Sequence, residues 1–143
     1  MKYSVQGRRK KIEAIQRKEM SNTRILMVDD DTDVNTTLRT VLEANGFNVD
    51  SYEDPLLALS NFKIRFYDLV ILDIKMPEMN GFSLYREIKR LDKTVKVCFL
   101  TAGEMYYGAY DDIFSSLDAK CLIRKPIENG KLIERINEII SPN

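Results

Sequence analysis

The sequence predicts a doubly wound α/β domain, in which helices cover both faces of a parallel β-sheet. Short apolar runs alternate along the chain with stretches whose apolar residues recur at helical spacing. Runs such as LVIL (69–72) are apolar without alternation, as expected of strands buried on both faces. The 143 residues, 44% of them hydrophobic and 31% charged, suffice for one domain with a core of its own.

Five strand–helix units follow one another from residue 24. The predicted strands are 24–28, 47–52, 68–73, 95–101 and 119–123. The predicted helices are 33–45, 55–64, 81–91, 104–116 and 128–140. Asn45-Gly46 is suited to end the first helix, and Asn80 to cap the third. Right-handed crossovers between parallel strands bring the carboxyl ends of the strands to one edge of the sheet.

The charges are unevenly distributed, although the net charge is zero. Residues 1–22 hold seven basic and two acidic side chains, and the remainder holds 15 basic and 20 acidic ones. We therefore expect a basic extension over 1–22, disordered or helical, followed by one domain over 23–143. The simpler interpretation gives the extension no binding role. The alternative is that it binds nucleic acid or an acidic partner.

The composition argues against several classes of protein. The chain has no histidine, and its two cysteines (Cys98 and Cys121) lie in apolar runs, which argues against a disulfide framework and a structural zinc site. No apolar stretch approaches the ~18 residues of a membrane span. The basic N-terminus lacks the apolar segment of a secretory signal. We expect a cytoplasmic protein that does not insert into a membrane.

Reactive side chains follow four of the predicted strands. They are Asp29, Asp30, Asp31, Asp73, Thr101 and Lys125. Because ligands in such folds bind outside the carboxyl ends of the strands, we expect one site there. Carboxylates without histidine or thiolate favour Mg²⁺, and a carboxylate beside Mg²⁺ can act as a nucleophile toward phosphorus. An ammonium and a hydroxyl would stabilise the phosphoryl group, for which the small Ala102 leaves room.

The acids beyond Asp30 have a simpler interpretation. Asp31 and Asp33 are suited to the start of a helix, where a carboxylate caps the chain or interacts with the helix dipole. An EF-hand loop is excluded, since Val34 stands where glycine is required and Thr40 where the bidentate glutamate is required.

Four segments of the chain strongly resemble the receiver domain of two-component response regulators. They are VDDD (28–31), LVILDIKMPEMNG (69–81), FLTAG (99–103) and IRKPI (123–127). Their spacing fits as well, with 43 residues from Asp30 to Asp73 and then 28 and 24 residues to the threonine and the lysine. The resemblance covers 24–140. It implies a chemotaxis-regulator-like, flavodoxin-like (βα)5 sandwich with strand order 2-1-3-4-5.

The resemblance also implies roles for individual residues. Asp73 is the expected phosphoacceptor, and Thr101 and Lys125 are expected to contact the phosphoryl group. The expected Mg²⁺ ligands are Asp29, acting mainly through water, Asp30, Asp73 and the backbone carbonyl of Lys75. The bond between Lys125 and Pro126 is expected to be cis.

The implied function is a phosphorylation-controlled switch. A sensor histidine kinase or phosphotransfer protein would act upstream. A separate target protein would act downstream, since no output domain fits after the last predicted helix. Such a switch catalyses only its own phosphorylation and dephosphorylation.

Three features depart from the family pattern or modulate it. Leu122 stands where family members commonly place tyrosine or phenylalanine, so we expect the segment 102–122 to move without rotation of an aromatic ring. Lys75 and Gly103 match positions that border the path of the hydrolytic water, and we expect Lys75→Ala to change the dephosphorylation rate. The extension over 1–22 lies outside the pattern.

Two other functions compete with the switch. A pseudo-receiver that binds proteins without phosphorylation is favoured only by Leu122. A Mg²⁺-dependent phosphatase with an aspartate nucleophile is suggested by the spacing of Asp29 and Asp31, but Asp33 stands where that group has threonine or valine. The phosphatase also leaves LDIKMPEMNG (72–81) unexplained.

Overall fold

The computed structural model describes residues 22–102, 111–117 and 121–141, and contains a parallel sheet of five strands. The strands lie in the order β2-β1-β3-β4-β5, which is the predicted order. Their bounds are β1 (Arg24–Val28), β2 (Asn48–Tyr52), β3 (Leu69–Asp73), β4 (Lys96–Ala102) and β5 (Leu122–Lys125). The strand order changes direction between β1 and β3, so the carboxyl ends of these two strands flank the place where such folds bind ligands.

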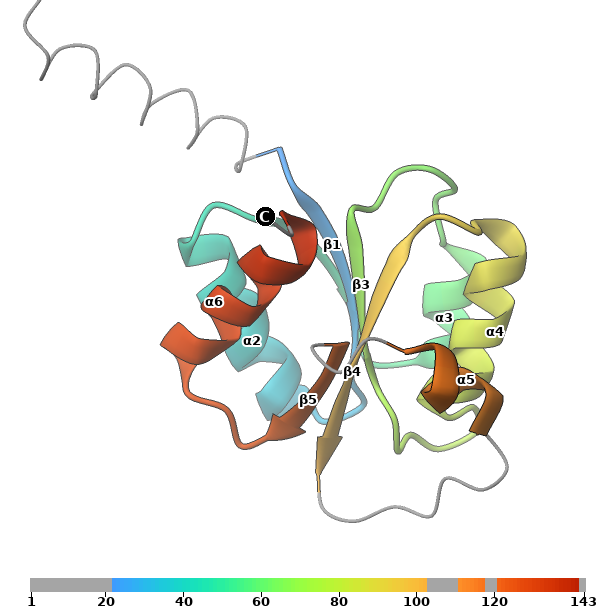
Figure 1. Ribbon diagram of the computed structural model, residues 1–143. Coiled ribbons are helices and arrows are strands. Elements are labelled where there is room, and N and C mark those ends of the chain that lie inside the picture. The colour runs from blue at the N-terminus through green and yellow to red at the C-terminus, as the bar shows by residue number, and fades with distance from the viewer. Residues whose placement is uncertain (1–21, 103–110, 118–120, 142–143) are drawn as a thin grey trace, which may run out of the picture.

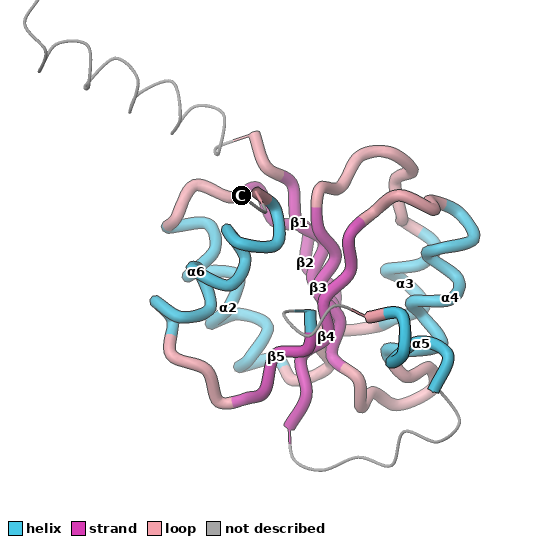
Figure 2. Tube along the Cα trace, in the orientation of Figure 1, coloured by secondary structure: helices cyan, strands magenta, loops and turns pink. Residues whose placement is uncertain are grey.

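Helices cover both faces of this sheet (Figure 1). On one face lie α2 (Thr32–Ala44) and α6 (Asn129–Ile140). On the other lie α3 (Pro55–Ser60), α4 (Gly81–Leu91) and α5 (Asp111–Ser116). Figure 2 shows the three layers with the strands edge-on. Within the described ranges, no helix is both long enough and apolar enough to cross a membrane.

The central strands supply two separate apolar cores because successive side chains point to opposite faces. Leu26 and Leu72 pack on the side of α3, α4 and α5, together with Phe82 of α4. Ile25 and Ile71 pack on the other side. All five residues of β3 are buried, which confirms the prediction of a strand covered on both faces.

Helix ends follow the predicted capping chemistry. The Asp31 carboxylate caps α2 by accepting hydrogen bonds from the backbone N–H groups of Asp33 and Val34. Asn80 caps α4 through the backbone N–H of Ser83. Asn45 ends α2, and the next residue, Gly46, has a φ of 91°, a conformation that favours glycine.

Two predicted elements within the described residues differ from the structure by more than one residue at an end. The helix predicted over 55–64 ends at Ser60, where the Asn61 side chain donates to the Leu57 carbonyl and the chain tightens into a turn with a bond from the Phe62 N–H to the Leu59 carbonyl. The last strand is Leu122–Lys125 rather than 119–123, since pairing with the end of β4 extends it to Lys125. The first part of the helix predicted over 104–116 lies outside the described residues, as does the extension up to residue 21.

Candidate functional site

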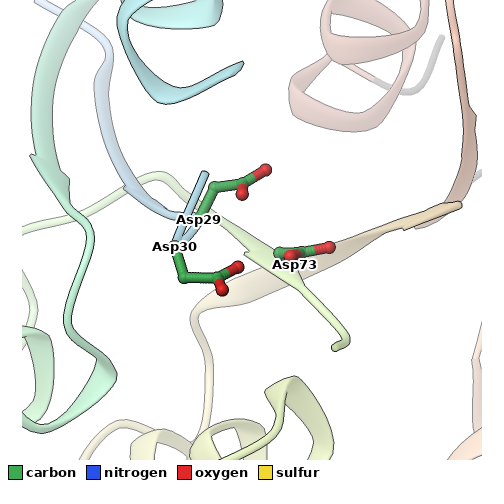
Figure 3. Close-up of side chains that lie close together, drawn as sticks. All are labelled: Asp29, Asp30 and Asp73. Atoms are coloured by element: carbon green, nitrogen blue, oxygen red, sulfur yellow. The ribbon is translucent and has the colours of Figure 1, made fainter. Parts of the chain in front are cut away.

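Three carboxylates meet at the carboxyl ends of β1 and β3 (Figure 3). Asp29 and Asp30 directly follow β1, and Asp73 is the last residue of β3. One oxygen from each carboxylate lies within 4.8 Å of the others, a spacing at which a single metal ion could contact all three. Asp29 is fully buried and Asp73 is 7% exposed, whereas Asp30 is open to solvent. The arrangement is an acidic pocket of oxygen donors, the donor type that Mg²⁺ prefers.

Lys125 joins two of these acids from the end of β5. Its Nζ atom lies 2.7 Å from Asp29 Oδ2 and 3.4 Å from Asp73 Oδ1. The lysine side chain is 19% exposed, so these ion pairs are partly shielded from water. The ammonium therefore offsets part of the repulsion between carboxylates that burial would otherwise make costly. The Lys125–Pro126 peptide bond is cis.

The backbone around Asp29 is fixed by a buried asparagine. Asn35 of α2 donates from Nδ2 to the carbonyls of Asp29, at 3.1 Å, and of Tyr52, at 2.9 Å. The Asp29 N–H donates to the same Tyr52 carbonyl, and the Asp31 N–H donates to Asp29 Oδ1. These bonds tie the end of β1 to α2 and to β2, and so orient the Asp29 carboxylate.

Thr101 and Ala102 lie at the end of β4. Thr101 is 2% exposed, and its Oγ1 atom has no hydrogen-bond partner among the described residues. A buried hydroxyl without a partner is costly, and such groups often mark a place where a ligand binds. Ala102 is exposed and pairs with Lys125 in the register of β4 and β5.

Charge and burial shift two protonation equilibria in the pocket. Burial, followed by the nearby charge of Asp29, raises the pKa of Asp73 from 3.8 to about 6, against the opposing effect of Lys125. Burial alone would lower the pKa of the Lys125 ammonium, but its hydrogen bond and attraction to Asp29 raise it above the usual value. A divalent cation would favour the ionised form of Asp73 and so lower its pKa.

Gly81, at the start of α4, packs against the backbone of Asp73. A Cβ atom at Gly81 would overlap the backbone carbonyl oxygen of Asp73 and would lie 3.0 Å from Ile74 Cα. The Gly81 N–H also donates to the Ile74 carbonyl at 2.8 Å. The first turn of α4 thus packs directly against the backbone at the end of β3, an approach that only glycine permits.

The remaining predicted site residues are less closely grouped. Asp31 caps α2 rather than joining the acid cluster, as the helix-start interpretation expected. The side chain of Lys75 is exposed in the loop after β3, and Leu122 is half-buried against the core beside α3, α4 and α5. Gly103 lies outside the described residues.

Two residues that shape the site were not singled out from the sequence. The signal for Asn35 was its place three residues before Leu38 and seven before Leu42, which puts a polar side chain on the buried face of a helix. For Gly81 the signal was a glycine at the first position of a predicted helix. Asn80 already caps that helix, so the cap itself does not require glycine at the next position.

Most of this chain matches one known protein family. The family model for the response regulator receiver domain matches residues 25–137. The chain is a member of the response regulator receiver family. The receiver domain is a signalling switch rather than a conventional enzyme, and the predicted fold and family are thereby confirmed.

Similar proteins support this assignment. Chemotaxis protein CheY from Bacillus subtilis is 33% identical over 119 residues, which cover 82% of this chain and 98% of that protein. The non-phosphorylated HemR receiver domain from Leptospira biflexa superposes with a TM-score of 0.73 at 28% identity, covering 83% of this chain and 94% of that one. The chain spans about half the length of the transcriptional regulators that it matches.

A second similar solved structure is that of a complex with BeF₃ and Mg²⁺. One chain of the CheX–CheY–BeF₃–Mg²⁺ complex from Borrelia burgdorferi superposes with a TM-score of 0.70 at 27% identity. The match covers 82% of this chain and 88% of that chain.

Proposed function

We propose that this receiver domain accepts a phosphoryl group on Asp73 from a histidine kinase or phosphotransfer protein, with Mg²⁺ as the cofactor. The observation that carries the proposal is the convergence of Asp73 with Asp29, Asp30 and Lys125 on one acidic pocket. A fold alone would not support this proposal, because function depends on the residues of the site. The Mg²⁺-containing complex of a similar CheY is consistent with it.

Each side chain has a defined role in the proposed reaction. A carboxylate oxygen of Asp73 forms a bond to phosphorus while the bond from phosphorus to the donor breaks, and the leaving group departs with that electron pair. Lys125 is positioned to pair with the product phosphoryl group, since its ammonium already lies 3.4 Å from Asp73 Oδ1. Thr101 supplies the buried hydroxyl that would donate to a phosphoryl oxygen.

Mg²⁺, when bound, would neutralise charge on the reacting phosphoryl oxygens. Asp29, Asp30, Asp73 and the Lys75 carbonyl are the proposed ligands. Asp29 is engaged by Lys125 at 2.7 Å, which fits its expected indirect action through water, whereas the exposed Asp30 is free to bind directly. We further propose that Leu122 and the segment 102–122 carry the phosphorylation signal to a separate target protein.

Phosphorylation by a small donor tests this proposal. Incubation with Mg²⁺ and acetyl phosphate should add about 80 Da to the intact protein, the mass of one phosphoryl group. Asp73→Asn should give no adduct, because an amide is a poor nucleophile. Wild-type protein that takes up no phosphoryl group would favour the pseudo-receiver. An adduct on the asparagine variant would show that the acceptor is another residue.

Measurements of Mg²⁺ affinity would distinguish the roles of the neighbouring acids Asp30 and Asp31. We expect Asp30→Ala to weaken Mg²⁺ binding by at least about tenfold, because it removes a direct carboxylate ligand. Asp31→Ala is the matched control, since it should leave the affinity nearly unchanged and cost about 1 kcal/mol of stability through loss of the α2 cap. Calorimetric titration with Mg²⁺ and thermal unfolding measure the two effects. Equal losses of affinity would overturn the assignment of ligands.

A further inference from the structure

A groove of about 590 Å³ lies between α4 and α5, away from the acidic pocket. These two helices are neighbours on the same face of the sheet (Figure 1). Four basic side chains line the groove from α4 and the turn that follows it: Arg86, Lys89, Arg90 and Lys93. The spacing of Arg86, Lys89 and Arg90, three and four residues from the first, places these three along one side of α4, and Lys93 follows in the turn after the helix. The groove therefore presents a stripe of positive charge.

This stripe contrasts with the rest of the domain. Outside the extension, the chain carries 15 basic and 20 acidic side chains. Asp112 is the one acidic side chain among the described residues that line the groove. A local excess of cations on an acidic body attracts a small acidic partner, but the body repels a long polyanion such as nucleic acid. The charge pattern thus favours a short acidic ligand.

The ion pairs already in the groove are weak and exchangeable. Arg86 contacts both carboxylate oxygens of Asp112, at 3.0 and 3.2 Å, and both side chains are well exposed. Arg90 contacts Glu87 at 3.1 Å with its own side chain 75% exposed. Exposed pairs of this kind contribute only about 0–1 kcal/mol. A carboxylate from a partner could therefore replace Asp112 or Glu87 at little cost.

Some side chains of the groove are held in place by the rest of the domain. Lys89 donates from Nζ to the carbonyls of Val95, at 2.5 Å, and Lys93, at 3.3 Å, so its charge is held in place. Ile113 is buried, and the half-buried Tyr85 ring packs against Phe99 of the core. The half-buried Tyr85 ring among the cations would suit a peptide that carries both carboxylates and an apolar residue better than an inorganic anion.

We propose that the groove between α4 and α5 docks an acidic peptide segment of a partner protein. Carboxylates of that segment pair with Arg86, Arg90 and Lys93, and one apolar side chain rests on the half-buried ring of Tyr85. The proposal does not depend on phosphorylation, since every residue invoked lies outside the acidic pocket.

Fluorescence anisotropy with a labelled peptide, in which glutamates flank one leucine, tests the proposal on unphosphorylated protein. We expect saturable binding, with an affinity weakened about fivefold by Lys93→Glu. The matched control is Lys131→Glu, an equal change of charge on the exposed surface of α6, which should have little effect. A peptide with alanine in place of leucine should bind more weakly, and amide chemical shifts should change mainly in α4 and α5.

Several outcomes would overturn the proposal. They are the absence of saturable binding to the wild-type protein, equal weakening by the two lysine variants, and chemical-shift changes centred away from α4 and α5. Tighter binding of a single-stranded oligonucleotide at the same residues would assign the groove to nucleic acid instead. Circular dichroism of each variant excludes unfolding as the cause of lost binding.

Discussion

Replacing Gly81 with alanine should lower the free energy of unfolding by roughly 2–3 kcal/mol. This is within the range found when an extra carbon is forced into a site that is already filled. The new methyl group would meet the backbone carbonyl oxygen of Asp73 and the Cα atom of Ile74, not the end of a flexible side chain. Either α4 or the end of β3 has to move. Denaturant unfolding, with a fitted midpoint and slope, measures the loss.

Another glycine provides the control. Gly130 lies in α6, and a Cβ atom there would meet only the Glu128 side chain, at 3.5 Å. Gly130→Ala should therefore leave stability unchanged or raise it by about 0.5–1 kcal/mol, the usual preference of a helix for alanine. If the two alanine variants were equally stable, the close approach of α4 to the Asp73 backbone would not be the constraint that we infer.

The same substitution should affect the site as well as the fold. Because the start of α4 packs against the backbone of Asp73, displacement of β3 would move the Asp73 carboxylate relative to Asp29 and Lys125. We expect folded Gly81→Ala protein to take up a phosphoryl group from acetyl phosphate more slowly than Gly130→Ala, since positioning errors of about 1 Å cost large factors in rate.

Removing the charge of Asp73 should stabilise the metal-free protein by about 2 kcal/mol at pH 7. Burial and the charge of Asp29 raise the pKa of Asp73 from 3.8 to about 6, so the folded state disfavours the ionised carboxylate that neutral pH imposes. Asp73→Asn removes that cost. Lys125 remains paired with Asp29 at 2.7 Å, so the substitution leaves no cation without a partner in the pocket.

The pH dependence has a definite sign. Between about pH 4 and pH 6 the folded state binds more protons at Asp73 than the unfolded state does. The contribution of Asp73 to stability is therefore most favourable below pH 4 and declines as pH rises through 6. In chelator-containing buffer, the stability difference between Asp73→Asn and wild type should grow across this window and level off above it.

Two controls make this result specific. Glu134→Gln removes an equal charge from the exposed surface of α6 and should change stability little. Addition of Mg²⁺ should stabilise the wild-type protein through binding and have less effect on Asp73→Asn. A destabilised Asp73→Asn variant in metal-free buffer would contradict the inference that repulsion dominates in the pocket.

Much of the architecture could be predicted because each strand carries its own apolar signal. The bounds of β1 and α4 match their predictions, and the buried runs placed Asp73 and Thr101 at strand ends. The end of β5 was harder to predict. Its bounds depend on pairing with β4, a contact between distant parts of the chain that local composition does not encode.

Within the site, the sequence identified the charged groups but not what holds them in place. Asn35 acts by crossing from α2 to the carbonyls after β1 and β2, and Gly81 acts by having no side chain at one backbone contact. Both roles depend on tertiary proximity. The ion pair of Lys125 with Asp29 likewise could be expected only in outline, since its 2.7 Å distance follows from how β5 joins the sheet.

The position of β5 has a consequence for when the protein becomes competent to signal. Lys125 is 96 residues from Asp29 along the chain, and its strand lies at the edge of the sheet, where β4 is its one neighbouring strand. Edge elements open locally at a lower free energy than global unfolding requires. A molecule in which β5 has detached still keeps its other four strands, but its acids have lost their ammonium. Competence of the proposed phosphoacceptor site is therefore lost whenever this edge opens, before the domain as a whole unfolds.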